Sequence, residues 1–128
     1  MSVGGAAKKI TRAVAEWPDT AAAPHRFGGV EFSVGKREIG HLHGDRLLDV
    51  PFPRAIHDEL IAAGAAERHH ILRDSGWVSF RIGKSADVAG AIALLRKSYD
   101  LILAQTERRS AQTAAAKMMK AAPSSAAR

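Results

Sequence analysis

The chain has 128 residues, enough for one domain with a buried core and some residues left over at each end. It contains no cysteine, which excludes disulfides, thiolate metal ligands and cysteine nucleophiles and favours a reducing, cytoplasmic location. The formal net charge is +6, but residues 17–105 hold eleven basic and eleven acidic side chains, so the basic excess lies in residues 1–16 and 106–128.

A basic excess in flexible ends produces salt-sensitive attraction to polyanions rather than a shaped recognition surface, and this argues against specific nucleic-acid binding. No apolar run approaches the roughly 18 residues of a membrane span. No hydrophobic signal core follows the first lysines of the chain. We therefore expect a soluble, unprocessed, cytoplasmic protein that does not associate with a membrane.

Hydrophobic periodicity and turn residues predict an alternation of short strands and helices. In chain order we expect a helix over residues 6–16, an edge strand with Pro24 over 21–27, three strands over 30–34, 37–43 and 46–50, a helix over 54–63, strands over 67–72 and 77–82, and a covering helix from Ser85. The strands predict an antiparallel sheet covered by helices on one face, which is an α+β two-layer sandwich. We divide the chain into an N-terminal helix (1–16), a single domain (17–105) and an alanine-rich basic tail (106–128), either frayed helix or disordered.

Two-residue turns at Gly35-Lys36 and Gly44-Asp45 would set the pairing of the three central strands. In that register His41 lies opposite Val30 and Leu48, and His43 shares its face. One face of the sheet then carries the two histidines with the apolar residues Val30, Phe32, Val34, Ile39, Leu48 and Val50, and the other carries Glu31, Gly40 and Asp49. A slip of one residue would exchange the faces of a whole strand.

His41 and His43 are two residues apart in a predicted strand, so their side chains point the same way with about 7 Å between their bases. Both could bind one divalent metal ion if the fold supplied a third ligand, for which the candidates are His57, Asp45, His69 and His70. Since the H-x-H spacing alone is a weak signal, we interpret His41 as a half-buried structural histidine and His43 as a strand-end residue, and we assign no metal ion. Adjacent strand residues point to opposite faces, so His69 and His70 are not expected to share one site.

Glu31 and Asp49 lie on strands either side of Gly40, about 10 Å apart in the predicted register. Across a gap left by the glycine they could flank a small ligand, or a water used in acid–base chemistry. The alternative, which we favour, is that each carboxylate is solvated or paired with an arginine such as Arg26, Arg37 or Arg81.

Six segments carry a family resemblance, namely HRFGGVEFSVGKREIGHLHGD, DVPFP, the predicted helix RAIHDELIAAG, HHIL, SGWVSFRI and LLRKSYDLI. They resemble the bacterial luciferase-domain proteins, a family of unknown function, over roughly residues 15–105. The resemblance implies an α+β domain without an agreed reaction, substrate or cofactor, and the label does not establish light emission. Its motif positions fall on Glu31, Gly40, His41, His43, Asp49, Pro51, Pro53, His70, Gly76, Trp77 and Arg81. A shorter similarity of WVSFRI and SYDLI to the MmcQ/YjbR group implies a sandwich fold sometimes linked to DNA binding.

Two functions remain open, and the sequence does not decide whether the protein is an enzyme. The first is small-molecule binding in an enclosed cavity, with the candidate ligand-binding residues His41, His43, Glu31, Asp49, Trp77 and Arg81. The second is a noncatalytic domain that binds protein or nucleic acid through a shallow sheet surface and the basic ends. The neutral central region favours the first. The ligand, any cofactor and the oligomeric state are not specified by the sequence.

Overall fold

The computed structural model describes residues 4–25 and 28–120, and the strands in that part of the chain form one six-stranded antiparallel sheet in the order β1-β2-β3-β4-β6-β5. The helices are α1 (Ala6–Ala15), α2 (Arg54–Ala62) and α3 (Ala86–Lys120). The strands are β1 (Thr20–Pro24), β2 (Val30–Val34), β3 (Arg37–His43), β4 (Leu47–Pro51), β5 (Glu67–Arg68) and β6 (Trp77–Arg81). The predicted α+β class is confirmed, and β1 lies at an edge of the sheet as its proline requires.

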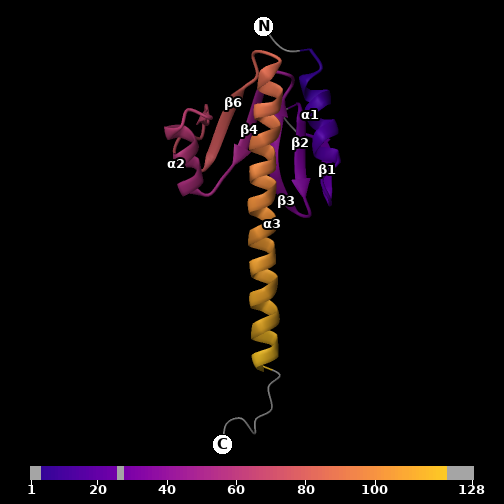
Figure 1. Ribbon diagram of the computed structural model, residues 1–128, viewed down its shortest axis with the longest axis vertical. Coiled ribbons are helices and arrows are strands. Elements are labelled where there is room, and N and C mark those ends of the chain that lie inside the picture. The colour runs from indigo at the N-terminus through magenta and orange to yellow at the C-terminus, as the bar shows by residue number, and fades with distance from the viewer. Residues whose placement is uncertain (1–3, 26–27, 121–128) are drawn as a thin grey trace, which may run out of the picture.

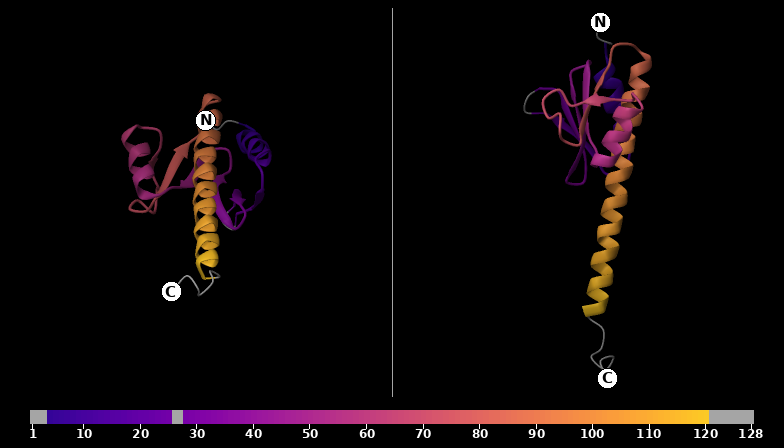
Figure 2. Two further views of the ribbon diagram at one scale, coloured as in Figure 1. Left: turned by 60° about the horizontal axis from the view of Figure 1, so that its bottom comes forward. Right: turned by 90° about the vertical axis from the view of Figure 1, so that its left-hand side faces the viewer.

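The described helices lie on one side of the sheet, where α3 packs against the central strands β3 and β4 and α1 runs beside α3 next to the edge strand β1 (Figures 1 and 2). The core lies between these layers because one stripe of each helix and one face of each strand are apolar. Helix α1 buries Ile10 and Val14, while α3 buries Leu95 and Tyr99. The Tyr99 hydroxyl also donates a 2.8 Å hydrogen bond to the carbonyl of Pro18, which ties α3 to the segment after α1.

Helix α3 begins at a turn that Asp87 closes, since its carboxylate accepts the backbone N–H groups of Gly83 and Lys84 at 2.8 and 3.0 Å. The helix continues without a break to Lys120, and every residue from Thr106 to Lys120 is exposed, so its second half extends beyond the sheet (Figure 1). The remainder of the predicted tail, residues 121–128, lies outside the described part of the chain. Among the described helices, none combines the length and the apolar character that crossing a membrane requires.

The pairing of β2 with β3 differs from the predicted register. Phe32 lies opposite Gly40 rather than Ile39, and Glu31 lies opposite His41. The cause is a bulge at the Phe32/Ser33 step, where β3 contains one extra residue, so that Ile39 and Gly40 together face Phe32. As a result, the part of β3 that follows the bulge presents the opposite face from the predicted one.

The turn between β3 and β4 is one residue longer than predicted. It contains Gly44, Asp45 and Arg46, and it places His43 opposite Leu47 and His41 opposite Asp49. His41 and His43 therefore lie on the sheet face that carries Glu31 and Asp49, and this face points away from the helices. The prediction that they share a face with Phe32 and Leu48 is wrong.

Gly40 does not leave a gap beside the carboxylates, because it faces the core under α3. A Cβ atom at this position would lie 2.8 Å from the Asp49 carbonyl oxygen and 2.8 Å from Leu95 Cδ2. We expect Gly40→Ala to lower the free energy of unfolding by roughly 1–3 kcal/mol, the usual effect of overpacking a core. Urea denaturation would measure it, with Gly83→Ala as the control because a Cβ there meets only the Asp87 carboxylate, at 3.9 Å. Equal losses in the two variants would contradict the packing argument.

Candidate functional site

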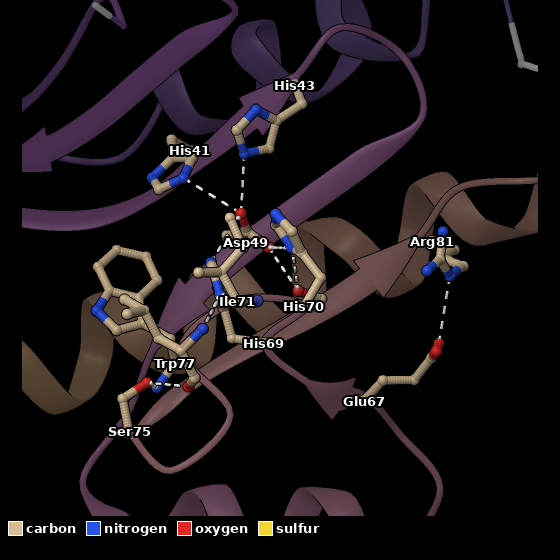
Figure 3. A network of polar contacts seen from close by, with 12 residues as sticks. His41, His43, Asp49, Glu67, His69, His70, Ile71, Ser75, Trp77 and Arg81 are labelled. Carbon is tan, nitrogen blue, oxygen red and sulfur yellow. Dashed lines mark hydrogen bonds and ion pairs between the residues drawn. The ribbon is translucent and has the colours of Figure 1, made fainter. Parts of the chain in front are cut away.

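The candidate site is built around Asp49, whose carboxylate is fully buried near the middle of the uncovered sheet face. Strand pairing places Glu31, His41, Asp49 and Ser79 in one row across β2, β3, β4 and β6. Because side chains alternate along a strand, His43 lies two residues from His41 on the same face. Figure 3 shows the histidine rings turned toward the Asp49 carboxylate from both sides.

One oxygen of Asp49, Oδ2, faces three imidazole nitrogens. The Nε2 atoms of His43, His41 and His69 lie 2.8, 3.3 and 3.3 Å from it. The other oxygen, Oδ1, accepts a 2.6 Å hydrogen bond from the Ser79 hydroxyl. Burial by itself raises the pKa of Asp49, but the hydrogen bonds from His41, Ser79 and His43 outweigh it and hold the pKa well below its ordinary value. Asp49 is therefore an anion in the folded protein.

His41 is held between two carboxylates. Its Nδ1 donates a 2.7 Å hydrogen bond to Glu38 Oε2, and its Nε2 points at Asp49 Oδ2. Burial lowers the pKa of His41, but the hydrogen bonds to Asp49 and Glu38 more than offset that effect and raise the pKa to about 9. At neutral pH the position between His41 Nε2 and Asp49 is thus occupied by a proton.

His69 has a fixed tautomer because its Nδ1 accepts the backbone N–H groups of Ile71 and Leu72 at 3.1 and 2.9 Å. In the neutral ring the proton must then lie on Nε2, from which it points to Asp49. Burial lowers the pKa of His69, and the attraction of Asp49 only partly offsets this. His69 is therefore a neutral hydrogen-bond donor to the carboxylate.

His69 and His70 lie side by side, against the prediction that they point to opposite faces. Strand β5 ends at Arg68, and the chain then turns, so the two rings stack with centroids 4.3 Å apart. His70 Nδ1 lies 3.9 Å from Asp49 Oδ1 and 3.4 Å from the Ser79 hydroxyl. The alternation rule failed here because it applies only within a strand.

Aromatic rings form the walls of the site. The Trp77 ring centroid lies 5.2 Å from that of His41 and 6.2 Å from that of His69. The ring of His25, beyond the end of β1, stacks on His41 with centroids 4.3 Å apart. These contacts fix the orientation of His41 on both sides.

Arg81 and Glu31 lie at the margins of this cluster. Arg81, at the end of β6, makes a 3.4 Å ion pair with Glu67 (Figure 3). Its side chain also borders two hollows. One hollow, of about 390 Å³, is lined by His43, Arg46, Leu47, Arg81, Ile82 and Gly83. The other, of about 520 Å³, is lined by Ile61, Ala66, Glu67, Arg68, His70, Arg73, Ser79 and Arg81. Glu31 lies opposite His41 in the pairing, but among the described residues it makes none of the hydrogen bonds of the cluster.

The structure brings together four of the six predicted site residues, namely His41, His43, Asp49 and Trp77. Of the four third ligands considered beside the histidine pair, Asp45 instead accepts the backbone N–H of Ala7 at 2.7 Å. His57 is buried within α2. Sequence reasoning did not select Glu38 or Ser79 as site residues. The one sequence signal that points to either of them is the alternation from Trp77 to Ile82, which predicts that Ser79 shares a face with Trp77 and Arg81.

The comparisons with known proteins give one family match and no individual relative. No curated protein and no solved structure shows a significant match to the chain. Residues 36–98 match the family described as Luciferase domain. The matched segment runs from the start of β3 into α3 and contains both histidine pairs, Asp49, Trp77 and Ser79. Over residues 36–98, just under half of its length, the chain is therefore similar to the Luciferase domain family.

Proposed function

We propose that this domain binds a small anionic molecule over the histidine-bearing face of the sheet. The observation that carries the proposal is the convergence of His41, His43 and His69 on the buried carboxylate of Asp49. Buried ionisable groups with strongly shifted pKa values cluster at functional sites, because binding and proton transfer need them. The candidate ligand-binding residues are those named from the sequence, with Glu31 at the margin of the site.

The hollows beside the cluster have the size expected of a small-molecule site, which is roughly 300–1,000 Å³. Their volumes are about 390 and 520 Å³, and neither is enclosed. The enclosed cavity expected from the sequence is thus replaced by an open groove, and this favours a ligand that remains partly in water.

The charge of the groove favours an anion. Arg46 and Arg81 line the hollow that contains His43, and none of the described residues that line it is acidic. A guanidinium group presents paired N–H donors that match the oxygens of a carboxylate or a phosphate. A ligand of this type would lie with its anionic group at the arginines and its other end near His43.

The test is a thermal-shift series on the full chain with citrate and inorganic phosphate as probes. Mass action requires a ligand that binds only the folded state to raise the unfolding midpoint, by at least ~5 °C at a hundredfold excess over Kd. We expect Arg46→Gln/Arg81→Gln to abolish the rise. The matched control is Arg108→Gln/Arg109→Gln, which removes the same charge from the exposed half of α3 and should retain it.

The alternative function is a noncatalytic interaction domain, and the extension of α3 supports it. Residues Thr106 to Lys120 are exposed throughout, and Met118 and Met119 are 74% and 80% exposed. A helical segment of this length is marginal in water by itself, so a partner along it would account for its continuity. A midpoint rise that is lost in the α3 control but kept in Arg46→Gln/Arg81→Gln would favour this alternative and contradict the proposal above.

A further inference from the structure

We infer that His41, His43 and Asp49 form a binding site for a divalent transition-metal ion, with Nε2, Nε2 and Oδ2 as the ligand atoms. The inference goes beyond the proposed anion binding and does not depend on it. It also departs from the interpretation of the sequence alone, which assigned no metal ion. The reason is that the structure supplies a third ligand, Asp49, which the predicted register put on the opposite face.

The separations of the ligand atoms fit a coordination sphere. Metal–ligand bonds of about 2.1 Å set neighbouring ligand atoms about 3.0 Å apart in an octahedral site and about 3.4 Å apart in a tetrahedral one. His43 Nε2 and His41 Nε2 lie 2.8 and 3.3 Å from Asp49 Oδ2, and all three ligand atoms lie within 4.8 Å of one another. Each histidine nitrogen thus lies at a distance from Asp49 Oδ2 that is close to the spacing of neighbouring ligands around one ion.

The tautomers that metal binding needs are supported by the surrounding hydrogen bonds. His41 donates Nδ1–H to Glu38, and this leaves Nε2 as the metal-binding nitrogen once its proton is displaced. A histidine whose second nitrogen donates to a carboxylate is the usual arrangement around protein-bound metals. Ser79 donates to Asp49 Oδ1, so the ion would bind Oδ2, which has a second lone pair beside the one that accepts the hydrogen bond from His69. His43 is one-third exposed, so its Nδ1–H can face water.

The neighbouring histidines do not complete the same site. His69 cannot offer Nε2 to an ion, because its Nδ1 is held as an acceptor by two backbone N–H groups. Asp49, His69 and His70 also have possible ligand atoms within 4.8 Å of one another. Because His69 is not a usable ligand, these three residues do not form a second metal site. His69 instead donates a hydrogen bond to Asp49.

Two imidazoles and one carboxylate select the class of metal. This ligand set suits Zn²⁺, Fe²⁺, Co²⁺ or Ni²⁺ rather than Mg²⁺ or Ca²⁺, which prefer oxygen ligands throughout. Three protein ligands also leave coordination positions for water or for an oxygen of a ligand, as in catalytic rather than structural sites. Because His43 borders the hollow that contains Arg46 and Arg81, those positions open toward the proposed anion.

The test is a calorimetric titration of the full chain with ZnCl₂ after treatment with EDTA and dialysis. We expect one equivalent to bind, and we expect His43→Ala to weaken the affinity at least ~100-fold by removing a ligand. Glu38→Gln, which removes only the hydrogen bond to His41, should weaken it about 10–100-fold. The matched control is His70→Ala, since His70 is about as exposed as His43 and also lies beside Asp49, and it should change the affinity by less than about threefold.

X-ray absorption of the zinc-loaded wild type gives a second readout that does not depend on the folding of any variant. It should show two imidazole nitrogens at about 2.0 Å. The absence of stoichiometric binding, a zinc shell without imidazole, or equal losses in His43→Ala and His70→Ala would each overturn the assignment.

Discussion

Replacing Asp49 by alanine is expected to lower the free energy of unfolding by about 3–5 kcal/mol, the range for removal of one partner from a buried charge network. The carboxylate is 0% exposed and is the common acceptor for His41, His43, His69 and the Ser79 hydroxyl. Alanine would leave these donors without their acceptor and His41 without one of its two counter-charges. Each buried donor that loses its partner carries its own desolvation penalty.

Urea denaturation at pH 7 with EDTA present would measure this loss without any contribution from bound metal. The control is Asp100→Ala, which breaks an exposed 3.0 Å ion pair with Arg96 and should cost less than about 1 kcal/mol. Asp49→Asn, which keeps one oxygen as an acceptor, should fall between the two. If Asp49→Ala were as mild as the surface control, the histidines would not depend on this carboxylate for their position.

The strand assignments that were predictable from sequence share one property. Apolar and polar residues alternate regularly along the strand, and a large apolar side chain marks the face that is buried. In β6, Val78 faces the core while Trp77 and Ser79 face the site, as the pattern Trp77 to Ile82 predicts. The edge position of β1 follows from Pro24 in the same direct way. In these places one local rule decides the face of the sheet, and no competing interaction overrides it.

The site itself was not predictable from the turn rules, because a bulge and a longer turn both moved the register by one residue. The two-residue turn at Gly35-Lys36 is confirmed, since Val34 pairs with Arg37. The sequence did contain a signal against the unbulged register predicted to follow that turn, since it places Leu42 on the same face as Glu31 and Asp49. Leu42 is in fact fully buried. If Leu42 is taken as a core residue, His41 and His43 must point away from the helices, and Ile39 can stay in the core only through a bulge.

The second histidine pair shows a different limit of sequence reasoning. His69 turns toward Asp49 because its own ring accepts the N–H groups of Ile71 and Leu72, and no local pattern in the sequence signals that bond. Glu38 reaches His41 only because of the bulge that follows it. Such contacts depend on tertiary structure, and they are the ones that set the tautomers on which the chemistry of the site rests.

Replacing Gly29 by alanine is expected to lower the free energy of unfolding by about 3 kcal/mol, with backbone overlap as the main cause. Gly29 has φ +85°, and a Cβ there would lie 1.8 Å from the carbonyl oxygen of Leu42 and 3.3 Å from the Cα of His43. A carbonyl oxygen within a sheet cannot rotate away as a flexible side chain can. The strand that carries His43 would have to move.

Gly28 is the matched control, because it has nearly the same φ, +88°, and nothing within 4 Å of its Cβ position. Gly28→Ala should therefore show only the left-handed backbone cost of about 1 kcal/mol. Imidazole NMR signals would report the effect on the site, and we expect those of His43 to shift in Gly29→Ala and to stay in place in Gly28→Ala. Equal losses of stability in the two variants would mean that the left-handed conformation alone, rather than the close approach to Leu42, makes glycine necessary here. A larger loss in Gly29→Ala with a displaced His43 signal would mean that this glycine holds the loop against β3 and thereby keeps His43 within reach of Asp49.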